Sequence, residues 1–528
     1  MKIETHYKLL TMKASSFTIW ASVLMTFAFN VMLLKYVILN TDISSASGIG
    51  VLLSIIVITF IITFTSFSFL ALISPVILKT FLIVVTILNS AAIHFMSNYQ
   101  VILDRTMIGN ILNTQKSESI ELISKDLVFT ILILGLGVSC IVLIFKVSRV
   151  DRKVIIRNMF IAFTSSVIFL YANASSWLWI DKHASVLGGK ILPWSYIINT
   201  ARHFSSINKT TNGQKPLANG RFLDNNKTVV VLVIGETARS ANFSLYGYSK
   251  LTNPKLEKEP NLLILRNTKS CTTYTTGSLK CILSPNEASV NEESLPTYLS
   301  RHGVDVQWRT NNWGEPPIKV SNYINANELR PDCEGKGCKL DEVLLTNLID
   351  AIRSSEKQKI FIILHTKGSH GPSYYSRYTQ EFNQFTPVCR DEEISKCSPE
   401  ELINAYDNTL LYTDHFLSTL IGELKSLRDA STAMIYISDH GESLGEYGLY
   451  LHGTPYAFAP NYQKDIPFLL WASDTFLAYK QINISDISQA PEHSQFNIFH
   501  TVMGAFGLSA PIYDRERDIL QNAPSENE

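Results

Sequence analysis

The chain has 528 residues, with 46 basic and 46 acidic side chains, and its mean hydropathy is positive. This length allows more than one domain. The balance of charges gives no reason to expect a nucleic-acid partner. The apolar excess is not spread evenly, because it gathers in long runs near the amino terminus, and this uneven pattern indicates membrane-spanning segments.

Five apolar stretches approach the length of about 20 residues that a helix needs to cross a hydrocarbon core. The third is the weakest, since it is short and contains Asn89 and His94. A cleaved signal peptide is the alternative for the first, which follows Lys2, Lys8 and Lys13, but that stretch is too long and no small-residue cleavage site follows it cleanly. We expect a five-span membrane domain over residues 1–180. The stretches are about Ser16–Leu39, Val51–Ile73, Thr80–Met96, Leu127–Phe145 and Met159–Trp177.

Positive charges in the short loops predict the orientation, because Lys and Arg mark the cytoplasmic side. The loop Thr41–Gly48 between the first two spans has none. With five crossings, the amino terminus is then cytoplasmic and everything after Trp177 lies outside. The positive residues between the fourth and fifth spans are Lys146, Arg149, Arg152, Lys153 and Arg157.

Six cysteines follow the membrane region as three close pairs in a polar context. An even number at short spacing outside the membrane predicts disulfides in an oxidising compartment, although sequence alone permits other pairings. Zinc binding by cysteine is the alternative, but no C-x-x-C pair occurs. Cys140 lies inside the fourth span, where we expect a small apolar residue without further role. The three pairs are Cys271/Cys281, Cys333/Cys338 and Cys389/Cys397.

An aromatic segment separates the two halves of the chain. Trp177–Trp179 and Pro193–Tyr196 are typical of residues that lie at a membrane surface. The polar stretch Lys209–Asn226 indicates a linker or surface loop. We therefore expect an interfacial segment and linker over residues 181–223 and an outer domain over residues 224–528.

The outer half alternates short β-branched runs with helical patterns. Thr228–Ile234, Lys359–Leu364 and Ala433–Ile437 are continuous apolar runs that suit parallel strands buried on both faces. Amphipathic segments, Leu340–Ser354 and Asp407–Leu427, precede the second and third runs. This order predicts an α/β domain with a mostly parallel central sheet, whose ligands gather at the carboxyl ends of the strands.

Polar side chains follow all three predicted strands. Glu236 follows the first, His370 the second, and Asp439 and His440 the third. Carboxylate oxygens and imidazole nitrogens are ordinary zinc ligands, and a catalytic zinc site leaves one position for a reacting group. The alternative is a set of polar caps and turns, which is less easily repeated at three strand ends. The pattern predicts a metal centre in a hydrolase or transferase.

The loop Cys271–Cys281 contains several hydroxyls that could react at such a centre. A hydroxyl near a metal can ionise and act as a nucleophile, and a following helix amino terminus would add backbone donors for a phosphate. The alternative is a threonine-rich surface loop. Composition does not choose among the hydroxyls.

These residues together resemble the phosphoethanolamine transferases of Gram-negative bacteria, which include lipid A modifying enzymes and the mobile colistin-resistance enzymes. With the five spans, the resemblance covers nearly the whole chain. The matching stretches are Ile234–Arg239 with Ser244–Tyr248, the Cys271–Cys281 loop, Gly368–Pro372, Asn404–Asn408, Ser438–Gly445 and Leu451–Gly453.

The resemblance implies an alkaline-phosphatase or sulfatase-like fold for the outer domain. It also implies that Thr275, four residues after the first loop cysteine, is the nucleophile. Glu236, Thr275, Asp439 and His440 would surround a zinc ion. His370 and His452 would lie nearby and either hold a second metal or protonate the leaving group.

A membrane-half segment resembles the family's donor-lipid segment. It comprises Met107–Asn110, Thr114 and Glu118, and the resemblance implies that Asn110, Thr114 and Glu118 bind substrate. Their spacing of four and eight residues predicts one helical face. An exposed polar face without a ligand is the alternative.

The implied reaction transfers phosphoethanolamine from phosphatidylethanolamine to lipid A or the lipopolysaccharide core at the bacterial inner membrane, with the catalytic domain periplasmic, and confers resistance to cationic peptides such as polymyxin. Trp313–Pro317 lacks a lysine that often follows in the lipid A enzymes; either Lys319 replaces it or the acceptor differs. His365–His370 resembles relatives that modify the inner-core sugar Kdo. Competing interpretations of the chain are a phosphoglycerol transferase or sulfatase of the same superfamily, an envelope scaffold, and a transporter.

Overall fold

The computed structural model describes residues 10–521 except 115, 149–150, 211–213, 289–291, 485–486 and 488–491. Arg149, used to predict the orientation, and Lys2 and Lys8, named for the signal-peptide alternative, lie outside the described residues, as does the side chain of Glu118. The chain divides into two compact units. One comprises Met1–Leu112 and Ile123–Ser206, and the other comprises Asn113–Leu122 and Ile207–Glu528.

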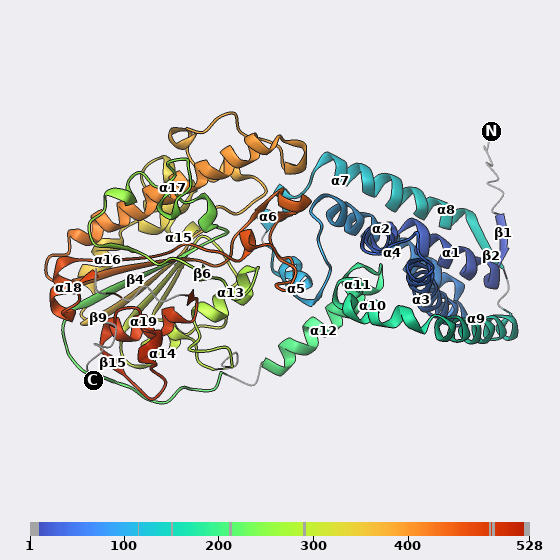
Figure 1. Cartoon of the computed structure of the whole chain (residues 1–528), viewed down its shortest axis with the longest axis horizontal. Helices are drawn as coiled ribbons and strands as arrows, with labels where there is room; N and C mark the ends of the chain where they lie inside the picture. Colours follow the sequence, from blue (N-terminus) through green and yellow to red (C-terminus); the bar gives the residue numbers. More distant parts are fainter. Residues whose placement is uncertain are drawn as a thin grey trace, which may run out of the picture. The chain divides into compact units, whose positions relative to one another are not determined.

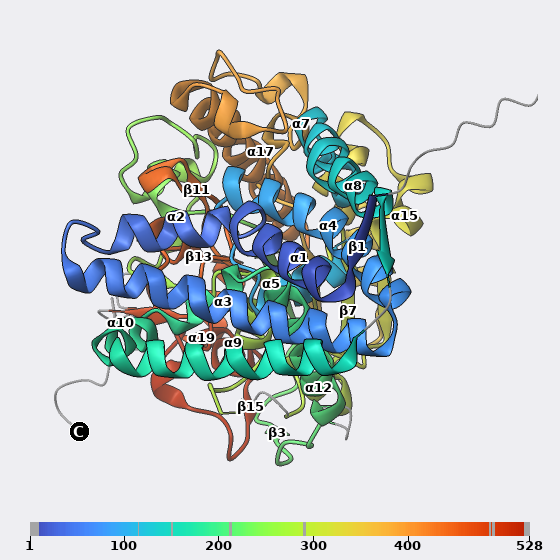
Figure 2. The same cartoon turned by 90° about the vertical axis from the view of Figure 1, so that its right-hand side faces the viewer.

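The first unit is helical. Among the described residues, four helices are long and apolar enough to cross a membrane, or five when the bent pair α1 and α2 counts as one span. Helices α1, α3 and α9 lie side by side (Figure 2). The five candidates are α1 (Ala14–Ala28) with α2 (Val31–Asn40), α3 (Ala46–Ile73), α4 (Pro75–Asn98), Lys125–Ile144, and α9 (Arg152–Ala172). Lys125–Ile144 consists of α7 (Lys125–Thr130), a π-helical turn (Ile131–Gly137) and α8 (Val138–Ile144). The predicted apolar helices are thus confirmed.

The first span bends by 51° between α1 and α2. Asn30 lies at the bend, where its side-chain amide donates to the backbone oxygens of Met25 and Leu192, both at 2.9 Å. Its side-chain oxygen also accepts from the backbone N–H of Leu192 at 2.9 Å. A side chain that replaces lost helical hydrogen bonds is an ordinary cause of a sharp kink.

Shorter helices and two paired strands complete the membrane half. The expected interfacial segment forms α10 (Trp177–Lys182), α11 (Ala184–Lys190) and the start of α12 (Trp194–Thr210). Strand β1 (Leu10–Lys13) pairs in parallel with β2 (Phe145–Ser148).

The predicted donor-lipid segment is not one continuous helix. Helix α5 (Arg105–Asn113) ends before Thr114, and α6 (Lys116–Glu121) begins two residues later. Spacings of four and eight residues give one face only while helical hydrogen bonding continues. The prediction that Asn110, Thr114 and Glu118 share a helical face is therefore wrong.

The second unit is built on a seven-stranded sheet (Figure 1). Its order is β5 (Leu262–Ile264), β13 (Phe468–Ala472), β10 (Ser431–Ser438), β4 (Thr228–Gly235), β9 (Lys359–His365), β7 (Asp305–Thr310) and β8 (Asn322–Asn325). The five strands from β10 to β8 are parallel, and β13 runs antiparallel to both of its neighbours. The three predicted strands are β4, β9 and β10, and every residue in them is buried. The predicted mostly parallel α/β sheet is confirmed.

Helices cover both faces of this sheet. Helices α16 (Leu348–Ser354) and α17 (Pro399–Lys425) lie on one side, and α13 (Thr275–Ile282), α14 (Leu295–Arg301) and α19 (Asn497–Phe506) lie on the other (Figure 1). Helix α17 begins earlier than predicted, because Ser398 and Glu401 form a capping box around Pro399. The predicted amphipathic segment Leu340–Ser354 is interrupted at Asn347, whose φ of 52° is left-handed.

The remaining elements are short. They are α15 (Ala326–Leu329), α18 (Asp474–Lys480), β3 (Arg221–Phe222), β6 (Thr268–Lys269), β11 (Ser443–Leu444), β12 (Tyr450–Leu451), β14 (His493–Ser494) and β15 (Leu508–Ser509). Long loops with short 3₁₀ turns follow the strand ends. These loops carry most of the polar residues singled out from the sequence.

All three predicted disulfides are present: Cys271–Cys281, Cys333–Cys338 and Cys389–Cys397. The thiol of Cys140, in α8, is free and exposed. Each disulfide closes a short loop, so none ties the membrane half to the outer domain.

We expect a non-reducing peptide map of the purified chain to contain these three linked pairs. Replacing both Cys271 and Cys281 by serine should lower the free energy of unfolding by about 2–4 kcal/mol, because the unfolded chain gains loop entropy. Chemical denaturation measures this loss. Cys140→Ser is the matched control and should leave the denaturation midpoint unchanged. Free thiols at the six paired positions would contradict the expected oxidising compartment.

Candidate active site

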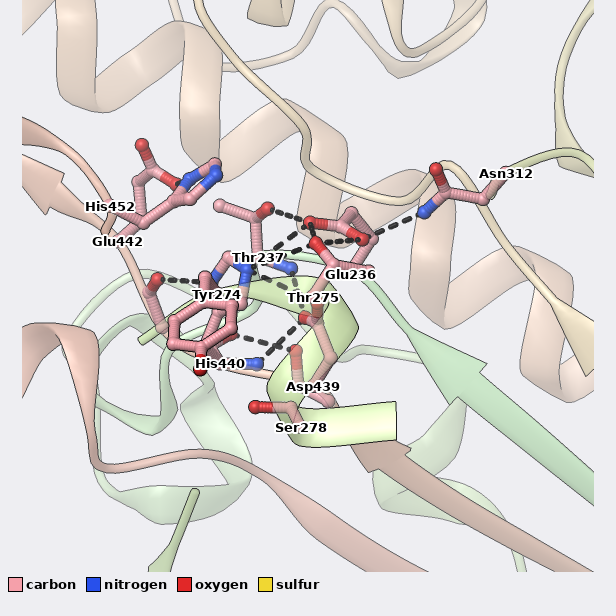
Figure 3. A network of polar contacts seen from close by, with 12 residues as sticks. Glu236, Thr237, Tyr274, Thr275, Ser278, Asn312, Asp439, His440, Glu442 and His452 are labelled. Atoms are coloured by element: carbon pink, nitrogen blue, oxygen red, sulfur yellow. Dashed lines mark hydrogen bonds and ion pairs between the residues drawn. The ribbon is translucent and has the colours of Figure 1, made fainter. Parts of the chain in front are cut away.

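Three parallel strands deliver the predicted residues to one edge of the sheet. Gly235 pairs with Ser438, and Ile234 pairs with His365, so β4, β10 and β9 end at the same level. Glu236 directly follows β4, and Asp439 and His440 directly follow β10. All three side chains are buried and point toward one another (Figure 3).

Thr275 reaches this cluster from the first position of α13. Its Oγ1 lies 3.4 Å from both carboxylate oxygens of Glu236 and 3.4 Å from Nε2 of His440. Two other hydroxyls of the same loop are used elsewhere. Thr272 donates to the backbone oxygen of Tyr274 at 2.9 Å, and Thr273 donates to that of Thr454 at 2.6 Å. Among these three, only the Thr275 hydroxyl faces the cluster.

His440 and Asp439 present two acceptors to the same point. Nδ1 of His440 lies 2.9 Å from the backbone oxygen of Gly441, so it carries the ring proton and leaves Nε2 with a lone pair. That Nε2 lies 3.1 Å from Oδ2 of Asp439. Oδ2 is buried and accepts no hydrogen bond from a described residue. A cation between the nitrogen and the oxygen would satisfy both.

Glu236 is held by hydrogen bonds to both of its oxygens. Oε1 accepts from the Thr237 hydroxyl, and Oε2 accepts from the Asn312 side-chain amide, each at 2.7 Å (Figure 3). Burial and the neighbouring Asp439 raise the pKa of Glu236. Burial raises the pKa of Asp439 to about 7. Each carboxylate is unfavourable as an anion here unless a positive charge is present, and a divalent cation would supply it.

Two further histidines lie beside the cluster. The ring centroid of His452 is 4.3 Å from that of His440 and 5.5 Å from that of His370. Nδ1 of His452 lies 3.0 Å from Oε2 of the buried Glu442, whose other oxygen accepts from the Tyr374 hydroxyl at 3.0 Å. Burial raises the pKa of Glu442 well above its usual range. Glu442 thus orients the His452 ring.

The donor set fits zinc. Ligand atoms of Glu236, His440 and His452 all lie within 4.8 Å of one another, and the unpartnered Oδ2 of Asp439 adds a fourth donor beside His440. Oxygen and neutral imidazole nitrogen are the donors that a catalytic zinc ion takes. Two ligand sets are thus possible: the group with His452, and the set implied by the resemblance, with Thr275 and Asp439. Glu236 and His440 belong to both sets.

Glu442, Thr237 and Asn312 were not predicted from the sequence. Glu442 follows His440 by two residues and Thr237 follows Glu236 directly, so proximity to a predicted ligand was the available signal. Asn312 comes from the loop after β7, and only the sheet order places that loop beside Glu236.

Family models match both halves of the chain. The model described as phosphoethanolamine transferase EptA/EptB matches residues 59–207, and the sulfatase model matches residues 228–508. The second match covers the sheet and all of the clustered residues. It agrees with the fold and with the place of the cluster at the strand ends.

Curated relatives match most of the chain. Phosphoethanolamine transferase EptA of Helicobacter pylori is 40% identical over 85% of this chain and 86% of its own length. Phosphatidylethanolamine transferase Mcr-1 of Escherichia coli is 32% identical over 77% of this chain and 82% of its own length. A Kdo(2)-lipid A phosphoethanolamine 7''-transferase of Salmonella typhimurium is 25% identical over 86% of each.

Solved structures are also similar to this chain. The integral membrane lipooligosaccharide phosphoethanolamine transferase A (EptA) of Neisseria meningitidis has a TM-score of 0.85 and 28% identity, covering 97% of this chain and 99% of that one. The periplasmic domain of EptC from Escherichia coli, solved with zinc, has a TM-score of 0.50 and 26% identity, covering 60% of this chain and 92% of that one. This chain is a membrane protein of the EptA phosphoethanolamine transferase family.

Proposed function

We propose that this chain transfers phosphoethanolamine from phosphatidylethanolamine to lipid A or the lipopolysaccharide core through a phosphoethanolamine–threonine intermediate on Thr275. The observation that carries the proposal is the Thr275 hydroxyl, which lies 3.4 Å from both Glu236 and His440 at the first turn of α13. Family membership supports the class of reaction, and the geometry of the cluster supports its steps.

We assign Glu236, Thr275, Asp439 and His440 as the residues that hold zinc. Asp439 belongs in the set because its Oδ2 has no hydrogen-bond partner among the described residues and lies 3.1 Å from Nε2 of His440. When bound, the ion would lower the proton affinity of a hydroxyl and offset charge on a phosphoryl oxygen. The related EptC domain solved with zinc supports this choice of metal. A second metal held by His370 and His452 is the alternative to their role as acids.

In the first half of the reaction the Thr275 hydroxyl loses its proton to solvent, and its Oγ1 forms a bond to the phosphorus of the donor lipid while the bond from phosphorus to the glycerol oxygen breaks. The departing alkoxide takes a proton and leaves as diacylglycerol. His370 or His452 donates that proton, because both lie at the cluster and imidazole titrates near neutral pH. In the second half, an acceptor oxygen attacks the same phosphorus, the bond from phosphorus to Oγ1 of Thr275 breaks, and Oγ1 and the histidine regain their protons from the acceptor hydroxyl or from solvent.

The backbone of α13 assists the phosphate. Thr275 is the first residue of this eight-residue helix, so the reacting hydroxyl belongs to the helix end whose backbone N–H groups lack helical partners. Such N–H groups favour a negatively charged phosphoryl group. This placement favours phosphoryl transfer over a transporter or a scaffold.

The second part of the donor-lipid segment, Asn113–Leu122, belongs to the same compact unit as the catalytic cluster. Glu121, at the end of α6, forms an ion pair of 2.5 Å with Arg377, whose Nε also donates to the backbone oxygen of His370 at 2.8 Å. The segment that carries Thr114 and Glu118 is therefore connected to the loop that carries His370. This connection supports a role for the segment in binding the donor headgroup, and we propose Asn110, Thr114 and Glu118 as its binding residues from the family resemblance.

We propose that the loop after β7 contacts the acceptor. A Cβ added at Gly314 would lie 3.4 Å from the Thr275 side chain, so this loop packs against the nucleophile. Its continuation, with Tyr323, lines a hollow of about 680 Å³. Lys319 is the one cation among the residues that line it, and it replaces the missing lysine of the lipid A enzymes as a partner for an anionic acceptor.

We place the chain in the bacterial inner membrane with a cytoplasmic amino terminus and a periplasmic catalytic domain. The disulfides and the positive residues between the last two spans support this orientation. Adding an ammonium group to lipopolysaccharide offsets its negative charge, so expression should protect cells from cationic peptides such as polymyxin.

Mass spectrometry of lipid A and of the core sugars, with and without expression of the chain, tests the proposed function. We expect phosphoethanolamine on a lipid A phosphate or on Kdo only in cells that express it. The Thr275→Ala protein is the matched control. Phosphoglycerol on the acceptor would favour a phosphoglycerol transferase, and unchanged lipids would contradict the proposal.

We expect the membrane half to be needed for lipid transfer. A fragment comprising Phe222–Glu528 keeps the sheet and the clustered residues but lacks the donor-lipid segment, so it should hydrolyse small soluble phosphoesters slowly and modify lipid acceptors poorly. Vesicle assays with phosphatidylethanolamine and lipid A measure the difference from the full chain. Full transfer by the fragment in detergent-free vesicles would show that the membrane half is only a tether.

A further inference from the structure

Thr237 has an unusual backbone conformation beside the candidate metal ligands. Its φ is 60°, in the left-handed region, although its side chain is β-branched and fully buried. Such a conformation is a rare outlier for a β-branched residue and persists only where surrounding contacts hold it. All three polar groups of Thr237 make hydrogen bonds, and two of them go to candidate ligands.

The hydroxyl and the N–H of Thr237 reach different carboxylates. The hydroxyl donates to Oε1 of Glu236 at 2.7 Å, and the backbone N–H donates to Oδ1 of Asp439 at 3.0 Å (Figure 3). These carboxylates follow neighbouring parallel strands, β4 and β10. Thr237 therefore connects the ends of β4 and β10 through Glu236 and Asp439, the carboxylates that would hold the ion.

These two bonds decide which oxygens remain for the ion. Oδ1 of Asp439 also accepts from the backbone N–H of His440 at 2.7 Å, which leaves Oδ2 as the oxygen without a partner. Oε1 of Glu236 keeps capacity for a further contact and lies 3.5 Å from Nε2 of His440. Both remaining acceptor positions lie around the same imidazole nitrogen.

The strained backbone is also anchored by α17. The hydroxyl of the buried Tyr406 donates to the backbone oxygen of Thr237 and accepts from the backbone N–H of Arg239, both at 2.9 Å. This anchor holds the peptide that follows Thr237, whereas the bonds to the carboxylates hold its side chain and its own N–H. The left-handed conformation is thus fixed by both sets of contacts.

We infer that Thr237 is a positioning residue, which fixes the orientation of Glu236 and Asp439 so that one oxygen of each faces Nε2 of His440. The inference rests on the proposed zinc site. Hydrogen-bond partners of metal ligands typically change metal affinity about 10–100-fold when removed, because the ligand then has to be ordered as the ion binds.

The hydroxyl is tested by zinc titration of the full chain in detergent, in competition with a chelating dye. Thr237→Val keeps the branched shape and the N–H but lacks the donor, so its zinc affinity should fall about 10–100-fold. Thr237→Ser restores the hydroxyl and should keep the parent's affinity. In cobalt-loaded protein the visible absorption bands should shift for the valine variant and match the parent for the serine variant.

Two further variants separate this effect from general destabilisation. Thr432→Val removes a buried hydroxyl without a partner among the described residues, at the opposite end of β10, and should leave zinc affinity unchanged. Thr237→Gly lacks the hydroxyl but adopts a positive φ without strain, so it should fold even if the valine variant does not. The zinc affinity of the glycine variant should fall as much as that of the valine variant. Its melting temperature without metal should not fall.

Each outcome distinguishes the inference from the proposed function. If the parent binds zinc and the valine and glycine variants bind it equally well, the positioning role is wrong and the zinc site stands. If the serine variant loses as much zinc affinity as the valine variant, the missing hydroxyl does not cause the loss, and the inference is also wrong. If the parent itself binds no zinc, the proposed metal site fails.

Discussion

Replacing Thr275 by alanine should abolish phosphoethanolamine transfer. In the proposed reaction Oγ1 of Thr275 forms the covalent bond to phosphorus, and the hydroxyls of Thr272 and Thr273 in the same loop donate to backbone oxygens instead of facing Glu236 and His440. Loss of a nucleophile costs on the order of 10⁴–10⁶-fold in rate. Transfer from phosphatidylethanolamine to lipid A, followed by mass spectrometry, measures it.

The adduct itself identifies the nucleophile. After incubation of the parent chain with phosphatidylethanolamine alone, peptide mass analysis should find phosphoethanolamine on Thr275. Thr276→Ala is the matched control, because it removes the neighbouring hydroxyl of the same helix turn and should leave the adduct in place. An adduct on Thr273 or Thr276, or transfer by the Thr275→Ala protein, would refute the assignment.

Removing a candidate metal ligand should remove both zinc and activity. Glu236→Ala and His440→Ala each delete a donor that belongs to either choice of ligands, so metal analysis of the purified proteins should show a clear loss of zinc. Transfer should fall by roughly a thousandfold or more, as when other catalytic metal contacts or charge-stabilising groups are lost. Treating the parent with a chelator should have the same effect, and added zinc should restore activity.

A histidine away from the cluster provides the control. His415, in α17, stacks on Phe382 with ring centroids 5.0 Å apart and pairs with Glu342. His415→Gln should keep the zinc content and the activity of the parent. Full zinc content and activity in both Glu236→Ala and His440→Ala would mean that the ion lies elsewhere.

Sequence patterns predicted three of the seven strands of the sheet, together with the apolar spans, because these signals are local. An unbroken apolar run such as that of β4 suits a strand buried on both faces, and a run near the length of a bilayer core suits a spanning helix. Helix limits were less well predicted. The break at Asn30 depends on hydrogen bonds with Leu192, far along the chain, and the turn at Asn347 depends on a left-handed residue.

The choice of nucleophile in the threonine-rich loop shows what residue composition does not predict. Thr272, Thr273 and Thr275 are equivalent as residue types, and resemblance alone singled out Thr275 in the sequence. In the fold, the hydroxyls of Thr272 and Thr273 are bonded to backbone oxygens, and that of Thr275 faces Glu236. The start of α13 relative to the strand ends causes this difference.

The sequence by itself determined the class of fold, the apolar spans, the three local disulfides and the family, because these follow from residue type and short spacing. Only the tertiary structure decided which groups surround the cluster. Asn312, Glu442 and Tyr406 reach it from separate loops and a helix, and the left-handed Thr237 is held by Tyr406 and Asp439. Such contacts depend on the order of strands in the sheet, which has no local signature in the chain.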